Sequence, residues 1–209
     1  MQIKIIGFIL ILFISVIFIL FKSNRGGINM IEVNTDDNVH KILVAYFSKA
    51  GEQYSVGNII EGNTAIVAKI IADKLKGDLF EIKVKNDNYP KDYTKLTEYA
   101  KSEMVQNVRP EIEGKIENFA DYDVIFLGYP VWWGDKPMPV YTFLESYNFN
   151  GKTIIPFATH EGSGFTGIQN MDKTGAKVLK GLGIYGHVAQ NNKVETEKQV
   201  SEWLKGLGF

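Results

Sequence analysis

The stretch Val124-Ile125-Phe126-Leu127-Gly128-Tyr129-Pro130-Val131-Trp132-Trp133-Gly134 decides the fold of this 209-residue chain. Its first half is a continuous apolar run, as expected for a strand that is covered on both faces. Two tryptophans follow at once, in a segment whose proline and glycine indicate a loop. That much aromatic surface at a strand end is uncommon unless a flat ligand lies against it. Because ligands bind at the carboxyl ends of strands in open α/β sheets, the stretch predicts an α/β domain with a binding site here.

Short apolar runs alternate with helical stretches along the rest of the chain, which predicts a parallel sheet with helices on both faces. We expect strands at 42–47, 79–84, 122–128, 153–159 and 182–188, and helices at 64–75, 93–106, 139–145 and 195–207. This pattern suits a three-layer α/β/α domain. Right-handed crossovers then restrict the topology to a few doubly wound strand orders.

Composition and charge weigh against several classes of function. The net charge of −1 offers no basic field, so nucleic acid is not an expected partner. The absence of cysteine removes disulfides, thiol catalysis, cysteine-ligated zinc and iron–sulfur clusters. His40, His160 and His187 lack the spacing of metal ligands. We therefore predict neither a metal site nor a catalytic side chain.

The N-terminus carries an uncharged apolar run, Ile5 to Phe21, between Lys4 and Lys22. As a helix at about 1.5 Å per residue it would be about 25 Å long, near the low end of a bilayer span. We expect a transmembrane signal anchor at 1–22, a polar tether at 23–39 and the globular domain at 40–209. A cleaved signal peptide is the alternative, although no small-x-small cleavage site follows the run. Positive charges on the two sides are nearly balanced, so the membrane face stays open.

The first loop of interest begins Phe47-Ser48-Lys49-Ala50-Gly51 and ends Gly62-Asn63-Thr64, just before a predicted helix. Free N–H groups and the helix dipole favour a phosphate there, and glycine permits close approach. Plain capping by Asn63 or Thr64, without a ligand, is the alternative. The loop is neither G-x-G-x-x-G nor G-K-[ST], which weighs against dinucleotides and ATP.

Two further loops follow later strands. Trp132 and Trp133 could pack under the following helix, but two tryptophans together fit the wall of a planar heterocycle better. In Thr159-His160-Glu161-Gly162-Ser163-Gly164 the glycines indicate a bent backbone whose N–H groups could reach ring heteroatoms. Hydrolysis through Ser163, His160 and Glu161 is the competing chemistry. The segment lacks the G-x-S-x-G elbow, however, and residues this close in one loop seldom form a triad.

Together, Tyr46-Phe47-Ser48 with Gly62-Asn63-Thr64, the segment Gly128 to Gly134, and Phe157-Ala158-Thr159-His160-Glu161-Gly162-Ser163-Gly164 resemble the flavodoxin-like family. The likeness covers about residues 40–208 and points to a long-loop bacterial branch. It implies a flavodoxin-like sheet of five parallel strands in the order 2-1-3-4-5, with one non-covalent FMN. The residues that the resemblance assigns to FMN are Ser48, Lys49, Gly62, Asn63 and Thr64 at the phosphate, Pro130, Val131, Trp132, Trp133 and Gly134 beside the isoalloxazine, and Thr159, His160, Glu161, Gly162, Ser163 and Gly164 at its other edge.

The first loop departs from the compact T-x-T-G-N-T loop of short-chain flavodoxins, because a long insertion separates Ser48 from Gly62. The resemblance implies electron transfer through FMN at a membrane surface, to a redox partner protein or a small-molecule acceptor. An FMN-dependent NAD(P)H oxidoreductase that reduces a quinone or similar acceptor is the alternative. A flavin-free interaction module is a third class, because a fold does not by itself determine function.

Overall fold

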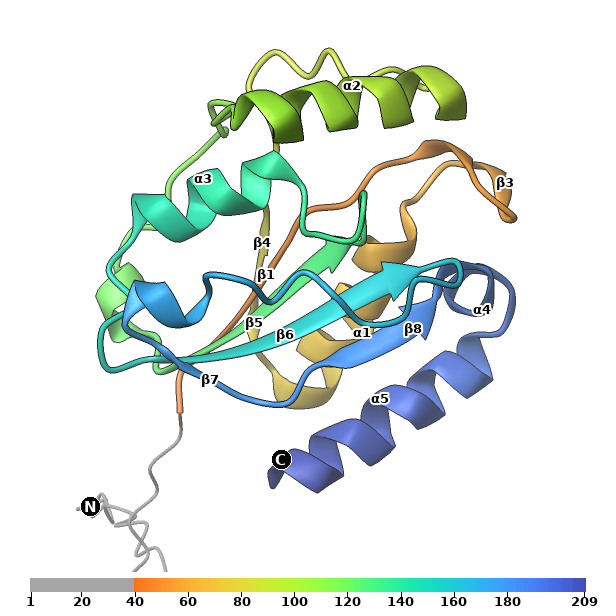
Figure 1. Ribbon diagram of the computed structural model, residues 1–209. Coiled ribbons are helices and arrows are strands. Elements are labelled where there is room, and N and C mark those ends of the chain that lie inside the picture. The colour runs from red at the N-terminus through yellow and green to blue at the C-terminus, as the bar shows by residue number, and fades with distance from the viewer. Residues whose placement is uncertain (1–39) are drawn as a thin grey trace, which may run out of the picture. The chain divides into compact units, whose positions relative to one another are not determined.

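The computed structural model describes residues 40–209 (Figure 1). The membrane anchor expected at 1–22 and the polar tether expected at 23–39 lie outside the described residues. Within 40–209, no helix has both the length and the apolar character needed to cross a membrane.

A parallel sheet forms the centre of the described domain (Figure 1). Its strands, in spatial order, are β4 (Asp78–Glu81), β1 (Ile42–Tyr46), β5 (Val124–Pro130), β6 (Thr153–His160) and a split edge made of β7 (Lys177–Val178) and β8 (Leu182–Tyr185). The short strands β7 and β8 both pair with β6. All strand pairings within this sheet of the described domain are parallel. With β7 and β8 taken as one interrupted strand, the predicted order 2-1-3-4-5 is confirmed.

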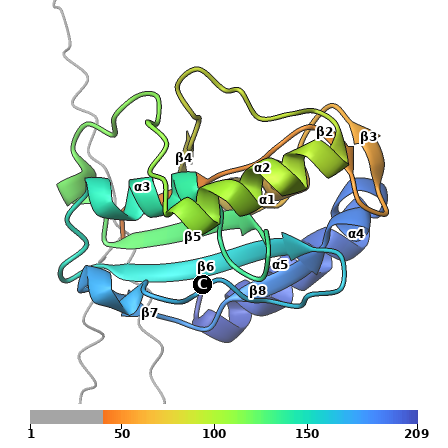
Figure 2. The ribbon, with the colours of Figure 1, turned by 45° about the horizontal axis from the view of Figure 1, so that its top comes forward.

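Helices cover both faces of the sheet (Figures 1 and 2). The helices α2 (Tyr93–Gln106) and α3 (Met138–Ser146) lie on one face, and α1 (Asn63–Leu75), α5 (Lys193–Leu207) and the short α4 (Gly186–Asn191) lie on the other. The bounds of α2 are those predicted from the sequence. The α/β/α layering is therefore confirmed.

Alternate residues of each central strand enter two separate cores. In β1, Leu43 packs into the core beneath α2 and α3, whereas Val44 packs into the core beneath α1 and α5. In β5, Ile125 and Phe126 divide in the same way. Successive side chains of a strand point to opposite faces, so a strand covered on both sides must be apolar throughout. This explains why the decisive stretch shows no polar alternation.

The fifth strand is shorter than predicted. The sequence pattern extends it to Val188, but β8 ends at Tyr185 and Gly186 begins α4. A Cβ at Gly186 would lie 2.2 Å from the side-chain nitrogen of Asn63 and 2.8 Å from Glu161 Oε1. The chain thus begins α4 close to the side chains of Asn63 and Glu161, and a strand pattern in the sequence does not report this tertiary contact.

The long first loop contains a hairpin that the sequence pattern did not predict. Its strands β2 (Gly51–Gln53) and β3 (Gly57–Ile59) pair antiparallel. The hairpin is joined to the segment before α2, because the Glu52 amide donates to the Lys91 carbonyl over 2.9 Å. The insertion therefore places a small structured wall beside the end of the sheet.

Candidate functional site

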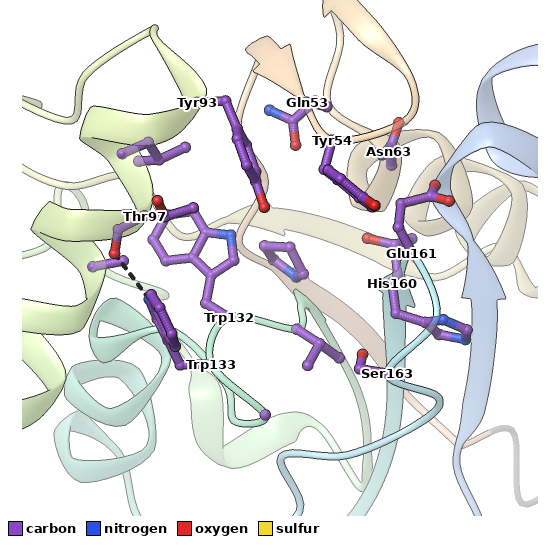
Figure 3. A pocket seen from close by; sticks show the side chains of 16 residues that line it. Gln53, Tyr54, Asn63, Tyr93, Thr97, Trp132, Trp133, His160, Glu161 and Ser163 are labelled. Atoms are coloured by element: carbon purple, nitrogen blue, oxygen red, sulfur yellow. Dashed lines mark hydrogen bonds between the residues drawn. The ribbon is translucent and has the colours of Figure 1, made fainter.

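The carboxyl ends of β1, β5 and β6 meet at one edge of the sheet. The register pairs Tyr46 with Gly128 and Gly128 with Phe157. A pocket of about 410 Å³ opens at this edge, between the strand-end loops, α2 and the hairpin (Figure 3). Its volume lies within the range of small-molecule sites.

The pocket brings together residues from all three predicted loops. The predicted site residues that line it are Asn63, Pro130, Val131, Trp132, Trp133, Gly134, Thr159, His160, Glu161 and Ser163. The predicted residues outside the lining are Ser48, Lys49, Gly62, Thr64, Gly162 and Gly164. The lining residues that the sequence assignment missed are Gln53, Tyr54, Tyr93, Leu96, Thr97 and Ala100.

The start of α1 is capped from a distance. Its N-cap residue, Gly62, has no side chain for capping, and the Ser48 hydroxyl accepts from the Ala65 amide over 3.1 Å instead. A Cβ at Gly62 would lie 2.2 Å from that hydroxyl, so the close approach requires glycine. Among the described residues, no acceptor is found for the amides of Asn63 and Thr64. Two N–H groups at the positive end of the helix dipole thus remain free for an anion.

Asn63 carries an unsatisfied buried group. Its side-chain oxygen Oδ1 is buried without a hydrogen-bond partner among the described residues, although the residue lines the pocket. Buried polar atoms are nearly always hydrogen-bonded, so an orphan of this kind needs a reason. The neighbouring Thr64 is satisfied, because its hydroxyl shares a 2.8 Å hydrogen bond with that of Thr159. Asn63 is therefore the polar side chain at this corner with a bond left to make.

Lys49 lies outside the pocket and is engaged elsewhere. Its ammonium donates to Asp87 over 2.5 Å and lies 5.4 Å from the centre of the Tyr89 ring. The sequence reasoning had no means of finding this partner, because Asp87 lies beyond the next strand.

The two tryptophans sit on a tight turn, Trp132 to Asp135, here called the tryptophan turn. Its ends exchange two backbone hydrogen bonds of 2.9 and 3.0 Å. The two central residues, Trp133 and Gly134, both have positive φ, +52° and +77°. This is the pattern of a type I′ turn, which normally carries asparagine, aspartate or glycine at both places. Tryptophan there is strained, and strain of this kind is concentrated at functional sites.

The indole rings have different surroundings (Figure 3). Trp132 packs edge-on against Phe47 and Tyr89, with ring centres 5.4 and 5.6 Å apart. Trp133 is 50% exposed, and its Nε1 donates to the Thr97 carbonyl on α2 over 2.8 Å. Trp133 thus lies against the preceding helix α2, Trp132 lies against Phe47 and Tyr89, and both tryptophans line the pocket.

A buried tyrosine–carboxyl pair supports Trp132 from behind. The Tyr89 hydroxyl donates to Glu103 Oε2 over 2.6 Å. Burial raises the pKa of Glu103, while the bond from Tyr89 acts in the opposite direction. Burial, followed by the bond to Glu103, raises the pKa of the Tyr89 hydroxyl. The wall behind the indole is therefore buried and hydrogen-bonded.

The third loop presents one neutral and one acidic side chain to the pocket. The ring nitrogen Nδ1 of His160 accepts from the Gly162 amide over 3.2 Å, and burial lowers the pKa of His160. Glu161 accepts from the amide and ring Nδ1 of His187 over 2.6 and 2.7 Å. The Ser163 hydroxyl donates to the Gly164 carbonyl rather than to a histidine. This geometry does not form the hydrolytic triad considered above.

The missed residues all lie on the hairpin and α2. The Tyr93 amide donates to Glu52 over 3.0 Å, and the rings of Tyr54 and Tyr93 lie 5.8 Å apart. Tyr54 is 58% exposed at the pocket rim. The glycines at 51 and 57 are the one local signal for this hairpin in the sequence. Residues 40–209 hold no cluster of three His, Asp or Glu side chains suited to a metal ion.

A doubly wound parallel sheet with the order 2-1-3-4-5 and a pocket at the carboxyl ends of its strands has the flavodoxin-like topology. A family model for flavodoxin matches residues 41–207, and this chain belongs to the flavodoxin family.

Solved structures with the same architecture agree with this assignment. One described as a flavoprotein from Bacteroides eggerthii is 31% identical, with a TM-score of 0.62 over 81% of this chain and 98% of that one. Another from Bacteroides uniformis is 30% identical, with a TM-score of 0.62 over 79% and 98%. A flavoprotein from Lactobacillus acidophilus in complex with FMN is 24% identical, with a TM-score of 0.57 over 79% and 99%, and shows likeness of fold. No curated protein matches the chain.

Proposed function

We propose that this chain binds one FMN non-covalently in the pocket and transfers electrons to a redox partner protein or a small-molecule acceptor. When bound, FMN supplies reversible uptake of one or two electrons. Membership of the flavodoxin family and the FMN complex of the Lactobacillus acidophilus structure support this choice of cofactor.

The unsatisfied Asn63 oxygen and the free amides beside it carry the proposal. They form the phosphate end of the pocket, defined by Gly62, Asn63 and Thr64 at the start of α1. Main-chain N–H groups would hold the phosphate, and the Asn63 NH₂ group could donate to it. The Asn63 oxygen, which is an acceptor, would gain its partner from a hydroxyl group of the ligand. The Ser48 hydroxyl accepts from Ala65 and still has its own hydrogen to donate. The residues present at this end therefore fit the group.

The ring end of the pocket, defined by the tryptophan turn, fits a flat heterocycle. Trp132 and Trp133 provide aromatic faces, and Pro130 and Val131 close the pocket beside them. The lining contains the carboxylate of Glu161 and no lysine or arginine. Added negative charge is costly in such surroundings, so we expect a redox potential below that of free FMN.

The charges of the residues that line the pocket also indicate whether a nicotinamide dinucleotide could bind there as the electron donor. A nicotinamide dinucleotide carries two phosphates, which proteins usually hold with cationic side chains or helix N-termini. Two helices begin at the pocket, α1 at Asn63 and α2 at Tyr93. The start of α1 is used by the FMN phosphate in this proposal, and at the start of α2 the amides of Tyr93 and Lys95 already donate to the carboxylates of Glu52 and Asp92. No cationic side chain lines the pocket. This supports an electron carrier over an NAD(P)H oxidoreductase.

One observation favours the enzyme as a second candidate, an FMN-dependent NAD(P)H oxidoreductase that reduces a quinone or similar acceptor. Tyr54 and Tyr93 extend the pocket beyond the residues of the three loops. Such a wall could receive a flat acceptor beside the cofactor.

The proposal includes a membrane location, with the apolar run Ile5 to Phe21 as an uncleaved anchor. Electron exchange would then take place at a membrane surface. Its support is the sequence run alone.

Purified full-length protein tests the function directly. We expect a yellow protein with one FMN per chain and no oxidation of NADH or NADPH, with or without a quinone. Quinone-dependent nicotinamide oxidation supports the enzyme instead. A colourless protein that takes up no added FMN contradicts the proposal.

A further inference from the structure

Lys136, directly after the tryptophan turn, is a buried lysine. The residue is 2% exposed, and its side chain is wholly enclosed. Lysine is almost never fully buried unless it is paired, because removing an ammonium from water is costly. Neither FMN binding nor electron transfer, as proposed above, uses this group. Its burial is therefore explained by what it holds in place.

The ammonium of Lys136 binds a segment that is remote in sequence. Its Nζ donates to the carbonyl oxygens of Gln169 over 2.6 Å and Gly167 over 3.3 Å. These acceptors lie 33 and 31 residues further along the chain, in residues 165–170, here called the extension of the third loop. One side chain thus joins the base of the tryptophan turn to the continuation of the loop that forms the opposite wall.

The contact between the tryptophan turn and the extension of the third loop leaves no space for a side chain at position 167. A Cβ at Gly167 would lie 2.8 Å from the Lys136 amide nitrogen and 2.8 Å from the Tyr129 ring. The Tyr129 hydroxyl donates to the Thr166 carbonyl over 2.8 Å. The extension is therefore packed tightly against the base of the turn, with the ammonium at the centre of the contact.

Helix α3 holds the lysine from the other side. Nζ lies 3.9 Å from the centre of the Tyr141 ring, and the Tyr141 hydroxyl donates to Asp135 Oδ2 over 2.7 Å. Asp135 also lies 3.4 Å from Nζ and accepts from the Lys136 amide. Burial lowers the pKa of Lys136, Asp135 acts against this, and the Arg109 guanidinium, 5.0 Å from the Tyr141 ring, adds to the lowering. Burial thus opposes the charged form of Lys136, and Asp135 favours it.

The turn that this contact supports is strained. Trp133 has a φ of +52°, which a free peptide would leave, because L-residues with bulky side chains disfavour that region. A strained conformation persists only where the surrounding structure holds it. We propose that Lys136 is a positioning residue for the pocket: its buried ammonium ties the tryptophan turn to residues 165–170 and so holds the aromatic wall where a planar ligand enters. The identity of that ligand as a flavin rests on the proposed function.

Lys152 provides a matched control. Its Nζ also donates to two carbonyl oxygens, those of Ala120 and Tyr122, over 2.9 and 2.6 Å. It also lies near an aromatic ring, with Nζ 5.4 Å from the centre of Phe119. Lys152 precedes β6, at the amino end of the strand, whereas the pocket lies at the carboxyl end. Lys152→Met therefore removes a similar set of bonds away from the pocket.

The first test needs no flavin. Amide hydrogen exchange is measured on the flavin-free full-length protein, its Lys136→Met variant and its Lys152→Met variant. We expect Lys136→Met to speed exchange about tenfold in both the tryptophan turn and residues 165–170, with β1 and α1 unchanged. Lys152→Met should leave both segments as they are. Acceleration in only one of the two segments, or in neither, overturns the proposal.

The second test uses FMN and riboflavin as probes. Because the contact acts at the ring end, Lys136→Met should weaken both ligands by the same factor, about tenfold, and Lys152→Met should weaken neither. A loss confined to FMN overturns the proposal, since it would place the effect at the phosphate. If Lys136 only stabilised the fold, Lys136→Met and Lys152→Met would both lower the melting temperature and would bind the flavins equally well.

A second variant covers the case in which Lys136→Met does not fold. Tyr141→Phe keeps the ring beneath the ammonium and removes only the hydroxyl that holds Asp135. It should give the same pattern of exchange and affinity at smaller amplitude, and a folded variant that matches the wild type overturns the proposal. A wild-type protein that binds neither flavin contradicts the proposed function, whereas the exchange measurement still decides the role of Lys136.

Discussion

At the phosphate end of the pocket the proposed binding groups are main-chain amides, whereas at the ring end they are side chains on a strained turn. The start of α1 presents its amides because of helix geometry, with only Ser48 brought in as a cap. The tryptophan turn needs α2, α3 and residues 165–170 to hold it. Ligand binding at the phosphate end should therefore be weakened by any added atom that displaces the backbone. Ligand binding at the ring end should be weakened by the loss of contacts that hold the tryptophan turn.

The largest effect is expected from intrusion at the phosphate end. In Gly62→Ala, the new Cβ would lie 2.2 Å from the Ser48 hydroxyl and 2.6 Å from the Lys49 carbonyl. The helix start must move, so we expect FMN affinity to fall more than about a hundredfold and stability to fall by about 1–3 kcal/mol. Calorimetric titration and thermal unfolding measure the two losses.

Gly206→Ala is the matched control for that substitution. Gly206 lies in α5, and a Cβ there meets nothing within 4 Å. Alanine should leave FMN affinity unchanged and stabilise the protein by up to about 1 kcal/mol. If Gly62→Ala binds FMN as well as this control does, the amides at the start of α1 do not hold the phosphate.

The next largest effect is expected at the ring end. Trp132→Ala removes the aromatic wall and the contacts with Phe47 and Tyr89. FMN and riboflavin should both weaken by about ten- to a hundredfold, and the redox potential of bound FMN should rise. Spectroelectrochemical titration reports the potential. The half-exposed Trp133 offers a comparison, since Trp133→Ala should give smaller changes in the same direction. An unchanged potential in Trp132→Ala would count against stacking.

A more selective change sharpens the contrast between the two ends. Asn63→Ala removes the buried oxygen that lacks a partner. FMN should weaken by about tenfold more than riboflavin, because the NH₂ group removed with that oxygen can donate to the phosphate that only FMN carries, whereas a hydroxyl that donates to the oxygen is present in both ligands. Stability without flavin should not fall, since no protein hydrogen bond to that oxygen is lost. An equal loss of affinity for the two ligands would show that Asn63 does not contact the phosphate.

The smallest effect concerns pH. Burial lowers the pKa of His160 below its ordinary value of 6.5. The unfolded chain therefore takes up this proton first, and stability is lost as the pH falls below about 6.5 toward the folded-state pKa. We expect the melting temperature to fall between pH 7 and pH 5 by less in His160→Asn than in the wild type. Parallel pH curves for the two proteins would show that His160 does not contribute.

The sequence allowed the central sheet and most helices to be predicted, because these depend on short-range patterns, whereas the strand order was predicted from the resemblance to the flavodoxin-like family. The apolar run ending at Gly128 and the helical spacing from Tyr93 are local signals. The helix has the predicted bounds, whereas the strand predicted at 122–128 begins at Val124 and continues to Pro130. The predicted end of the fifth strand was wrong, because β8 ends at Tyr185 and α4 begins at Gly186, beside Asn63. The hairpin was missed because its strands are too short to show a pattern.

For the candidate site too, the sequence predicted some features and not others. The loops could be located, because they follow strands whose carboxyl ends must lie at one edge of a parallel sheet. The partners of individual side chains could not be predicted. Lys49 was assigned to the phosphate and instead pairs with Asp87, and Tyr54 entered the pocket on the unpredicted hairpin.

By itself, the order of residues determined the α/β layering, the membership of the flavodoxin family and the edge at which a ligand would bind. Only the tertiary structure decided that Ser48 caps α1, that Asn63 is left without a partner and that Lys136 supports the tryptophan turn. The physical reason is range. Hydrophobic periodicity acts between residues a few positions apart, whereas a hydrogen bond depends on ångström-scale placement of groups that the chain brings together from far along its length.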